Sequence, residues 1–381
     1  MVTVNTVEVR RAKIVVVGAG PAGGACSLVL ARSRRAEVVL VDKSRYPRVK
    51  VCGSGLSPHA LRVLEQLELR GMLAPEHLHM AGITARGPSG RQVHLRGAKG
   101  AWVVPRVVLD HAIVRAARTA GAELREGTKV TALLRDGAGQ ACGVGTSQGE
   151  IEADLVICAN GSPSRFEVDP TPRRGIRTIM GWWRGVRLPA PDEGVMIWDA
   201  RLEGYYAWAF PEPRGVVNIG LTIPDDGAHA KRLRVLFREL LDEYFGAALT
   251  HAEPIGKWMG HPATVTTRVG RAIAEPRAVW CGEAARLVCP GTVEGIGFAL
   301  QSGMLAAQHV LGFDPRTGLS AIRRARYRSS VARHMLPRFW AGEALHRLMR
   351  SGRARTLAAG VFDPQWLSEH AAWLVGESRA R

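Results

Sequence analysis

Several signals that define common classes of protein are missing from this sequence of 381 residues. None of its six cysteines belongs to a C-x-x-C pair, and none of its twelve histidines belongs to an H-E-x-x-H motif. The sequence therefore predicts no metal site and no disulfide framework, and it favours reduced thiols in a cytoplasmic protein. No stretch is apolar for long enough to span a bilayer, and we find no internal repeat and no low-complexity linker.

Negative charge is also scarce. The sequence has 34 acidic residues against 52 lysines and arginines, which gives a formal net charge of +18. Such an excess suits an acidic partner: anionic lipid, nucleic acid or an acidic carrier protein. The alternative is a basic composition without a dedicated partner, and the even spread of the basic residues favours it. We therefore expect no nucleic acid partner, and we leave contact with the inner face of a membrane open.

The most informative stretch that is present runs from Lys13 to Gly23. A β-branched run enters a G-x-G-x-x-G turn, in which Gly18 makes the tight turn and Gly20 lets the backbone approach a pyrophosphate. Gly23 lets the following helix pack on the strand, and that helix points its positive end at the phosphates. A second apolar strand ends at Asp42, where an adenosine ribose would bind. The pattern predicts a dinucleotide site; the alternative is a glycine-rich turn in an ordinary α/β core.

Arg10 and Arg11 precede this apolar run and resemble a twin-arginine export signal. Cleavage of such a signal would remove the dinucleotide site, so we expect no export and a cytoplasmic location. A second G-x-G-x-x-G motif with an acidic partner is absent from the sequence. We therefore expect one tightly held dinucleotide and no separate nicotinamide domain.

The order of the remaining segments indicates an insertion. Predicted elements are a helix from Pro58 that ends at Gly71, a hairpin over 82–104, a helix over 109–120, paired strands at 128–134 and 141–146, a buried strand at 154–159, an antiparallel sheet over 170–225, a helix over 228–246, a strand near 278–281, a long helix from Gly295, and a basic helical region after 320 that carries Phe339, Trp340, Trp366 and Trp373. The glycine-rich strand-to-helix element at Gly282 would return the chain to the dinucleotide unit.

Five stretches resemble the para-hydroxybenzoate hydroxylase-like flavoprotein superfamily and, within it, the geranylgeranyl reductase family. Besides the dinucleotide motif, they are 50–58, similar to K-x-C-G-G-G-L-S-P; 106–110, like R-x-x-F-D; 206–211, similar to Y-x-W-x-F-P; and 282–303, which resembles G-D-A-A…P-x-x-G-E-G-I-x-x-A-x-x-S-G. The resemblance spans residues 13 to about 305 and leaves the C-terminal region without a matching motif.

The resemblance implies an α/β fold with a Rossmann-like FAD-binding domain, an inserted antiparallel β-sheet substrate domain and a helical C-terminus. We expect residues 1–75, 101–165 and 271–325 in the FAD-binding domain, residues 76–100 and 166–270 in the substrate domain, and residues 326–381 in the helical region. Glu283 would contact the ribityl chain, and the helix beginning near Gly295 would stabilise the anionic reduced flavin at its N1–C2=O edge.

Together, the motif and the resemblance predict these FAD-binding residues: Gly18, Gly20, Pro21, Ala22, Gly23, Asp42, Lys43, Lys50, Cys52, Gly53, Arg106, Val130, Asn160, Gly161, Gly282, Glu283, Pro290, Gly295, Ile296 and Gly297. Arg48 could also hold phosphate, but we favour a solvent-exposed charge there. Three departures from the family pattern stand out: Glu283 replaces Asp, Asn160-Gly161 replaces a frequent Asp-Gly, and Ser54 replaces the middle glycine of C-G-G-G. The second weakens direct use of NAD(P)H, so NAD(P)H, ferredoxin and quinol all stay open as electron donors.

For catalysis, the resemblance places Cys52 beside the isoalloxazine, where a thiol could tune the flavin or give a proton to substrate; the alternative is a small buried residue. Tyr206, Trp208 and Phe210 alternate along a strand and share one face. By resemblance this face, with Trp182 and Trp198, lines a hydrophobic substrate pocket, and Tyr206 and Trp208 join Cys52 as catalytic candidates. The alternative is the ordinary core of a second sheet.

The implied function is reduction of C=C bonds in an isoprenoid or other hydrophobic substrate by hydride from flavin N5. The alternative is an FAD-dependent monooxygenase, either an aromatic hydroxylase or a halogenase, although no counterpart of the halogenase tunnel lysine is evident. A third class is a non-enzymatic flavin-binding protein that acts through its charge. The expected partner is a hydrophobic small molecule or lipid, and an electron-donor or carrier protein stays open. The arginine-rich stretch 323–328 could lie on anionic membrane, but the alternative, a solvated helix face, is favoured.

Overall fold

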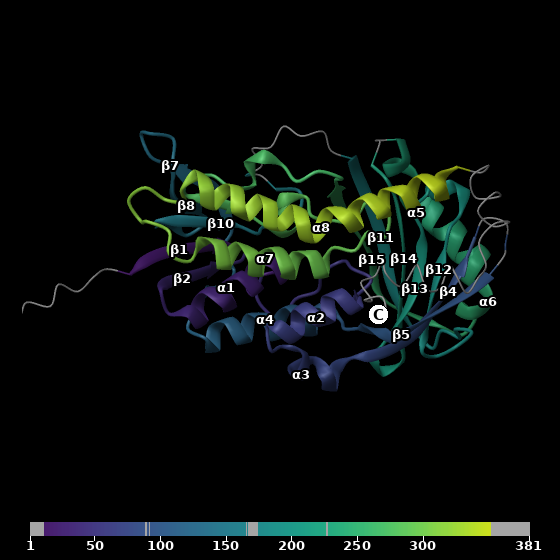
Figure 1. Ribbon diagram of the computed structural model, residues 1–381. Coiled ribbons are helices and arrows are strands. Elements are labelled where there is room, and N and C mark those ends of the chain that lie inside the picture. Colours follow the sequence, from purple (N-terminus) through teal and green to yellow (C-terminus); the bar gives the residue numbers. More distant parts are fainter. Residues whose placement is uncertain are drawn as a thin grey trace, which may run out of the picture.

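The computed structural model describes residues 11–87, 90, 92–164, 166, 174–225 and 228–351. Two large sheets lie side by side, a five-stranded parallel sheet and an eight-stranded mixed sheet, and helices pack around the parallel one (Figure 1). A separate three-stranded sheet contacts the parallel sheet through β8 and β10. The predicted fold class, a Rossmann-like α/β unit with an added β-sheet and C-terminal helix, is confirmed.

The strands are β1 (Ala12–Val17), β2 (Ala36–Val41), β3 (Gly55–Leu56), β4 (Leu78–Arg86), β5 (Gln92–Val103), β6 (Glu123–Arg125), β7 (Val130–Arg135), β8 (Ala141–Thr146), β9 (Gly149–Glu152), β10 (Leu155–Cys158), β11 (Arg174–Arg184), β12 (Glu193–Ile197), β13 (Ala207–Glu212), β14 (Val216–Pro224), β15 (Glu253–Val265) and β16 (Ala278–Trp280). The helices are α1 (Pro21–Ser33), α2 (Pro58–Gln66), α3 (Arg70–Leu73), α4 (Arg106–Thr119), α5 (Ala228–Leu240), α6 (Gly246–Leu249), α7 (Ile296–Val310) and α8 (Ala321–Arg350).

The parallel sheet has the order β16-β10-β1-β2-β6. Its central strands are apolar on both faces, and Val15, Val39 and Val156 are fully buried, as expected for a parallel sheet covered on both sides. The carboxyl ends of β1, β2 and β10 therefore meet at one edge, just before Gly18, Asp42 and Ala159. This is the edge at which open α/β sheets bind their ligands.

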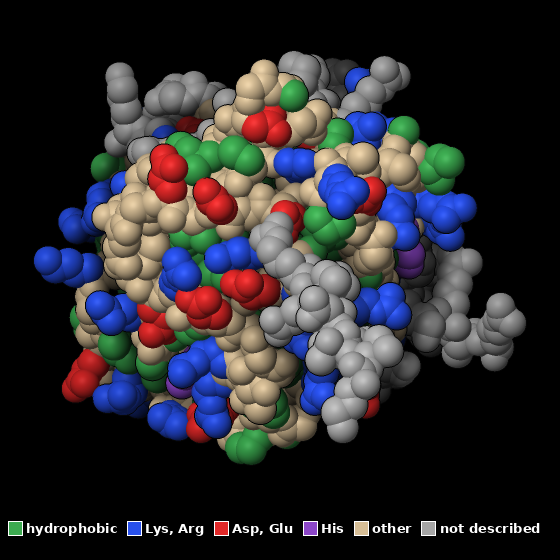
Figure 2. Space-filling model, turned by 90° about the vertical axis from the view of Figure 1, so that its left-hand side faces the viewer, with side chains coloured by type: hydrophobic (Ala, Val, Ile, Leu, Met, Phe, Trp, Pro, Cys, Tyr) green, Lys and Arg blue, Asp and Glu red, His purple; other side chains and the backbone are tan. Residues whose placement is uncertain are grey.

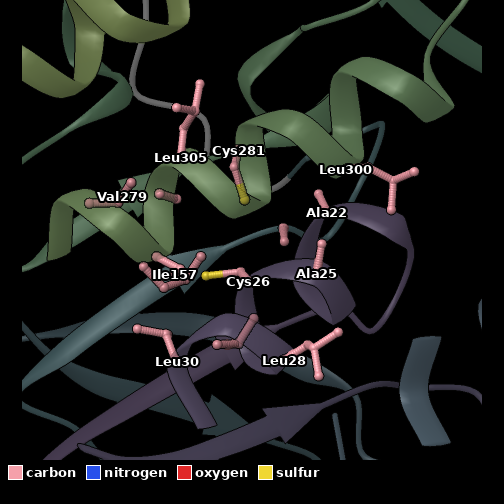
Figure 3. Packing of buried hydrophobic residues seen from close by; sticks show 14 of the residues in the cluster. Ala22, Ala25, Cys26, Leu28, Leu30, Ile157, Val279, Cys281, Leu300 and Leu305 are labelled. Atoms are coloured by element: carbon pink, nitrogen blue, oxygen red, sulfur yellow. The ribbon is translucent and has the colours of Figure 1, made fainter. Parts of the chain in front are cut away.

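The packing of α1 against α7 joins the first segment of this unit to the last. Cys26 on α1 and Cys281 after β16 lie in one apolar cluster with Ile157 and Leu305 (Figure 3). Gly303 permits the approach, because a Cβ atom there would overlap the carbonyl oxygen of Ala22. All six cysteines are free thiols, as the sequence predicted.

The mixed sheet has the order β15-β11-β14-β13-β12-β4-β5-β3, and its two faces carry different clusters of side chains. One face packs against α5 through Trp183, Ile219 and Phe237. The other carries Met180, Tyr206 and Trp208 in a separate cluster. Because side chains alternate along a strand, neighbouring Trp182 and Trp183 belong to opposite faces.

Helix α8 runs along both sheets (Figure 1). Near its start, the Tyr327 hydroxyl donates to the carbonyl oxygen of Trp280 at 2.8 Å, in the parallel sheet. Near its end, Glu343 accepts from Arg174 of β11 at 2.7 Å. The helix therefore connects the two sheets through one contact with each.

Most predicted elements are confirmed, with local differences. The hairpin over 82–104 is β4 and β5, and the paired strands are β7 and β8. The helix from Pro58 ends at Gln66, before the predicted Gly71, because Leu67 and Leu69 turn into the core and Glu68 takes φ 58°. The helix over 228–246 is interrupted by a π-helical turn at Leu241–Phe245. Trp366 and Trp373 lie outside the described residues, and the domain boundaries stay a prediction.

The surface charge is spread out on the face at the left of Figure 1. Lys and Arg side chains alternate there with Asp and Glu (Figure 2). This distribution agrees with the absence of basic runs in the sequence. Within the described ranges, no helix combines the length and the apolar character needed to cross a membrane.

Candidate active site

The larger of two adjoining cavities has a volume of about 530 Å³ and opens at the carboxyl edge of the parallel sheet. Predicted cofactor residues in its lining are Gly18, Gly20, Pro21, Ala22, Asp42, Lys43, Lys50, Cys52, Gly53, Arg106, Asn160, Gly161, Glu283, Gly295 and Ile296. Residues that were predicted from distant segments of the sequence therefore line one cavity.

The turn between β1 and α1 is built for close approach. Gly18 has φ 93°, and a Cβ atom there would lie 2.5 Å from the carbonyl oxygen of Ala159, so only glycine fits. A Cβ atom on Gly23 would overlap the carbonyl oxygen of Gly18, which explains the tight packing of helix on strand. At Gly20, by contrast, the nearest described atom belongs to Arg48 at 3.7 Å. The backbone there stays open to the cavity beside the N-terminus of α1.

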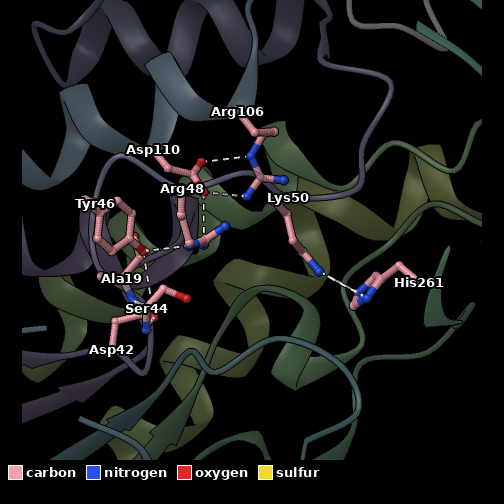
Figure 4. Close-up of polar contacts among 9 residues, drawn as sticks. All are labelled: Ala19, Asp42, Ser44, Tyr46, Arg48, Lys50, Arg106, Asp110 and His261. Carbon is pink, nitrogen blue, oxygen red and sulfur yellow. Dashed lines mark hydrogen bonds and ion pairs between the residues drawn. The ribbon is translucent and has the colours of Figure 1, made fainter. Parts of the chain in front are cut away.

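Asp42 holds this turn in place. Its Oδ2 accepts from the backbone N–H of Ala19 at 2.7 Å and from the Tyr46 hydroxyl at 3.1 Å, while Oδ1 accepts from the N–H of Ser44 at 2.8 Å (Figure 4). Each carboxylate oxygen has two lone pairs, so Oδ1 keeps one for a ribose hydroxyl. The carboxylate can thus organise the glycine-rich turn and bind a ribose at the same time.

Two arginines share one buried carboxylate in the cavity wall. Arg106 makes a bidentate pair with Asp110, with both contacts at 2.8 Å, and Arg48 reaches the same carboxylate at 3.0 Å (Figure 4). Asp110 is fully buried. One negative charge between two guanidinium groups leaves a net positive wall facing Gly20. The interpretation of Arg48 as a solvent-exposed charge is wrong, because its side chain is only 16% exposed.

Lys50 lies further along the same wall. Its Nζ is 2.8 Å from Nε2 of His261 (Figure 4), and that ring nitrogen is 3.6 Å from Oε1 of Glu283. Burial lowers the pKa of Lys50 to about 8, although Glu283 opposes the change. Glu283 replaces the aspartate of the family pattern and is longer by one methylene. Its carboxylate lies near His261, which in turn contacts Lys50 with its lowered pKa.

The second cavity is smaller, about 290 Å³, and its wall is mostly apolar. Met80, Ile83, Leu95, Met196, Trp198 and Leu345 are among its lining residues. Both cavities are lined by Cys52, Gly53, Tyr206, Phe210, Val293, Gly295 and Ile296. The two spaces therefore meet where the segment after β2, the aromatic strand β13 and the N-terminus of α7 come together.

The aromatic side chains at this junction are held by hydrogen bonds. The Tyr206 hydroxyl donates to the carbonyl oxygen of Thr292 at 2.5 Å, and burial raises the pKa of Tyr206, so the phenol stays neutral. The Trp208 indole donates to Oδ1 of Asn218 at 2.6 Å. The amide of Asn218 donates in turn to the carbonyl oxygen of Gly53 at 3.1 Å and to Glu212 at 2.8 Å. Burial raises the pKa of Glu212.

The structure separates the predicted residues into those at the cavities and those behind them. Trp198, Tyr206 and Phe210 line the apolar cavity, and Trp208 lines the larger one. In the part of the chain that the structure describes, Gly23, Val130, Trp182, Gly282, Pro290 and Gly297 line neither cavity. Trp182 instead donates to Glu212 at 3.4 Å, and Val130 packs on the main core. The catalytic roles of Cys52, Tyr206 and Trp208 stay a prediction.

Several residues at or near the junction were not predicted from the sequence. Val293 takes φ 54°, a conformation that is a genuine outlier for a β-branched residue, and it lines both cavities. The signal was present, because Val293 stands where P-x-x-G-E-G has its first glycine. Ser54, noted as a glycine replacement, likewise has φ 60°. His261 gave no local signal, since its contact with Lys50 joins residues 211 positions apart.

The donor set fits FAD on structural grounds. An open glycine backbone beside a helix N-terminus and a positive wall suit a pyrophosphate, and Asp42 suits a ribose. A second helix N-terminus, that of α7, meets the apolar cavity at Gly295 and Ile296, where it suits the N1–C2=O edge of an isoalloxazine.

Comparisons with known proteins agree with this geometry. Residues 11–310 match the family described as FAD binding domain. The chain is 30% identical to a menaquinone reductase of Mycolicibacterium smegmatis, over 96% of this chain and 94% of that protein. It is 29% identical to a digeranylgeranylglycerophospholipid reductase of Methanothrix thermoacetophila, over 90% and 91% of the two chains.

A solved structure of a geranylgeranyl bacteriochlorophyll reductase-like protein from Thermoplasma acidophilum superposes with a TM-score of 0.79. It covers 95% of this chain and 99% of that one at 20% identity, which shows the shared fold alone. The expected family and the expected cofactor are confirmed by the family match and the relatives. The chain therefore belongs to the family of FAD-binding-domain proteins, as an FAD-dependent oxidoreductase related to the geranylgeranyl reductases.

Proposed function

We propose that this protein reduces C=C bonds in the isoprenoid chain of a quinone or lipid. The observation that carries the proposal is the junction of the two cavities, where an apolar space meets the dinucleotide cavity at Cys52, Gly53 and the N-terminus of α7. The names of the relatives, a menaquinone reductase and a digeranylgeranylglycerophospholipid reductase, support the substrate class.

In this proposal the residues of the larger cavity bind and orient the cofactor. The turn at Gly18–Gly20 and the pair Arg48 and Arg106 hold the pyrophosphate, Asp42 holds the adenosine ribose, and Glu283 holds the ribityl chain. When bound and reduced, FAD supplies a hydride for one alkene carbon. The backbone N–H groups at the start of α7 stabilise negative charge on the cofactor.

The apolar cavity supplies positioning. An isolated alkene is a poor hydride acceptor, so catalysis depends on holding it at reaction distance and on excluding water. Trp198 and Phe210 provide a flat apolar wall that suits a prenyl chain. The Tyr206 hydroxyl already donates to Thr292, so we assign it to holding the wall rather than to binding a polar head group. Cys52 lies between the two cavities and would contact both cofactor and substrate.

A lipid substrate requires access from a membrane or a carrier. On α8, Ile322 is 66% exposed and Trp340 is 58% exposed, and arginines share the helix with them. We propose weak peripheral contact of this helix with anionic lipid at the cytoplasmic face. Flotation with phosphatidylglycerol vesicles tests it: binding at low salt that is lost at high salt supports the contact, and equal recovery with neutral vesicles contradicts it.

The test of the function uses photoreduced protein under argon, mixed with menaquinone in detergent micelles. We expect the isoprenoid chain to gain hydrogen as the flavin is reoxidised without oxygen, and we expect Ala101→Trp, which fills the apolar cavity, to slow this gain about tenfold or more. Ala138→Trp, on an exposed turn, is the matched control and should behave as wild type. Flavin that ignores menaquinone and yields oxygenated product in air would favour the monooxygenase alternative.

A further inference from the structure

A second polar group reaches the apolar cavity from behind the α7 N-terminus. Glu294 lines that cavity together with Ser57, and both belong to segments next to the predicted flavin site. The Ser57 hydroxyl donates to Oε1 of Glu294 at 2.6 Å. On the far side, Nδ1 of His59 lies 3.7 Å from the same oxygen. A carboxyl in the wall of a mostly apolar space thus has an imidazole behind it.

The hydrogen bonds of His59 fix where its hydrogen lies. Nε2 of His59 is 2.8 Å from Oε1 of Gln301, which is an acceptor, so Nε2 carries a hydrogen and donates it. Nδ1 therefore faces Glu294 and is a bare acceptor whenever the imidazole is neutral. Nδ1 of His59 and Oε2 of Glu294 are both buried, and neither has a hydrogen-bond partner among the described residues.

Two proton-free acceptors facing each other away from water are unfavourable, because each keeps its desolvation cost and gains no bond. One added proton removes the conflict, either as an imidazolium beside a carboxylate or as a carboxylic acid beside a neutral imidazole. Gly297 leaves room for the pair: a Cβ atom there would lie 2.7 Å from Oε1 of Glu294 and 2.9 Å from Nδ1 of His59.

We propose that Glu294 and His59 together hold one proton and deliver it, through Glu294, to the substrate carbon that does not receive the hydride. Glu294 is the catalytic residue because it reaches the cavity, and His59 is a positioning residue that stores the proton. This inference rests on the proposed function. It differs from the sequence-based assignment, in which the Cys52 thiol or a water supplies the proton.

Atoms and electrons balance in this step. The reduced flavin gives a hydride to one alkene carbon, and the π electrons form a C–H bond at the other carbon with the proton of the pair. The bond from that proton to oxygen or nitrogen breaks and leaves its electrons on the pair, as carboxylate and neutral imidazole. Arg338, whose charge interacts with Glu294, stabilises the carboxylate that results. Solvent then returns one proton to the pair.

The experiment compares wild type with Glu294→Gln, His59→Gln and Cys52→Ala, and uses Glu65→Gln, an exposed carboxylate on α2, as the matched control. Photoreduced protein reacts under argon with menaquinone, and separately with oxygen. We expect Glu294→Gln to slow hydrogenation of the menaquinone chain about 10²–10⁴-fold and to leave reoxidation by oxygen and FAD affinity within about threefold. Glu294→Asp should recover part of the rate. Loss of the rate in Cys52→Ala but not in Glu294→Gln would overturn the proposal.

A second readout needs no substrate. In protein labelled with ¹⁵N-histidine, the proton of the pair appears either as a protonated Nδ1 of His59 or as a carboxylic-acid band in the infrared spectrum. We expect one of these signals in wild type and its loss in Glu294→Gln. A bare Nδ1 together with an ionised Glu294 would overturn the proposal. Wild-type protein that does not react with menaquinone would instead overturn the proposed function.

Discussion

The Tyr206 hydroxyl donates to the carbonyl oxygen of Thr292 across 2.5 Å. This bond ties the residue before the aromatic strand β13 to the loop that leads into α7, so the walls of the two adjoining cavities are held by one contact. The geometry of the cavity junction therefore depends on a contact between two motifs, 206–211 and 282–303.

Replacement of Tyr206 by Phe should loosen the loop and leave the Thr292 carbonyl without its partner. A net hydrogen bond contributes about 1 kcal/mol, so we expect FAD affinity to fall about fivefold and substrate-driven reoxidation to slow by a similar factor. Quenching of flavin fluorescence on binding measures the affinity. If Tyr206→Phe binds FAD and reacts as wild type does, the bond has no role in positioning.

The Val293→Gly variant should have a higher free energy of unfolding than the Val293→Ala variant. At φ 54° an L-residue costs about 1 kcal/mol that glycine avoids, and both substitutions lose the same apolar contacts. The unfolding free energy of Val293→Gly should therefore exceed that of Val293→Ala by about 1 kcal/mol, measured by urea unfolding of the apoprotein. The reverse order would show that the loop does not hold this conformation in solution.

Asn218 should be a stability hot spot although it lines neither cavity. Replacement by Ala leaves the Trp208 indole, the Gly53 carbonyl and the buried Glu212 without their shared partner. At about 1–3 kcal/mol for each buried unpaired group, we expect a loss of about 3 kcal/mol in unfolding free energy, measured by urea unfolding. Gln148→Ala removes an amide side chain from an exposed turn, so it serves as the control and should change little. Equal stability of the two variants would contradict the role of Asn218.

FAD affinity should fall as the pH rises through about 8. Lys50 is charged below that pH and neutral above it, and the positive ammonium favours an anionic cofactor. Arginines and carboxylates ordinarily keep their charges over this range. We expect about a tenfold loss of affinity between pH 7 and pH 9.5 in wild type, measured by quenching of flavin fluorescence.

The matched variant for this titration is Lys50→Met, which retains the nearby thiol of Cys52. It should bind FAD more weakly at pH 7 and lose little further affinity on the way to pH 9.5. An equally steep decline in Lys50→Met would assign the titration to another group.

The local parts of the site could be predicted from sequence, because each is contained in one short segment. The spacing of the glycines from Gly18 to Gly23, and of Asp42 after them, is visible in the sequence. Strand alternation alone placed Tyr206, Trp208 and Phe210 on one face. The same alternation could not say which of two neighbouring tryptophans, at 182 and 183, faces inward, since that depends on where α5 packs.

Pairings between distant segments could not be predicted in the same way. Ser57 and Glu294 are 237 residues apart and meet only because α2 packs on α7. Likewise, Arg48 can share the Asp110 carboxylate with Arg106 only because α4 packs beside the segment after β2. Val293 is the opposite case: its sequence departure was visible, but its left-handed backbone shows that the loop kept the glycine conformation without the glycine.

The most direct test of the proposed reductase function is the mass of menaquinone after one anaerobic turnover with photoreduced protein. We expect a gain of two hydrogens for each C=C bond reduced in the isoprenoid chain, measured after reoxidation of the quinone ring; because the N5–H of reduced flavin exchanges with solvent, both positions carry deuterium in D₂O. Unchanged chain mass under argon, with oxygen entering an acceptor only in air, would contradict it.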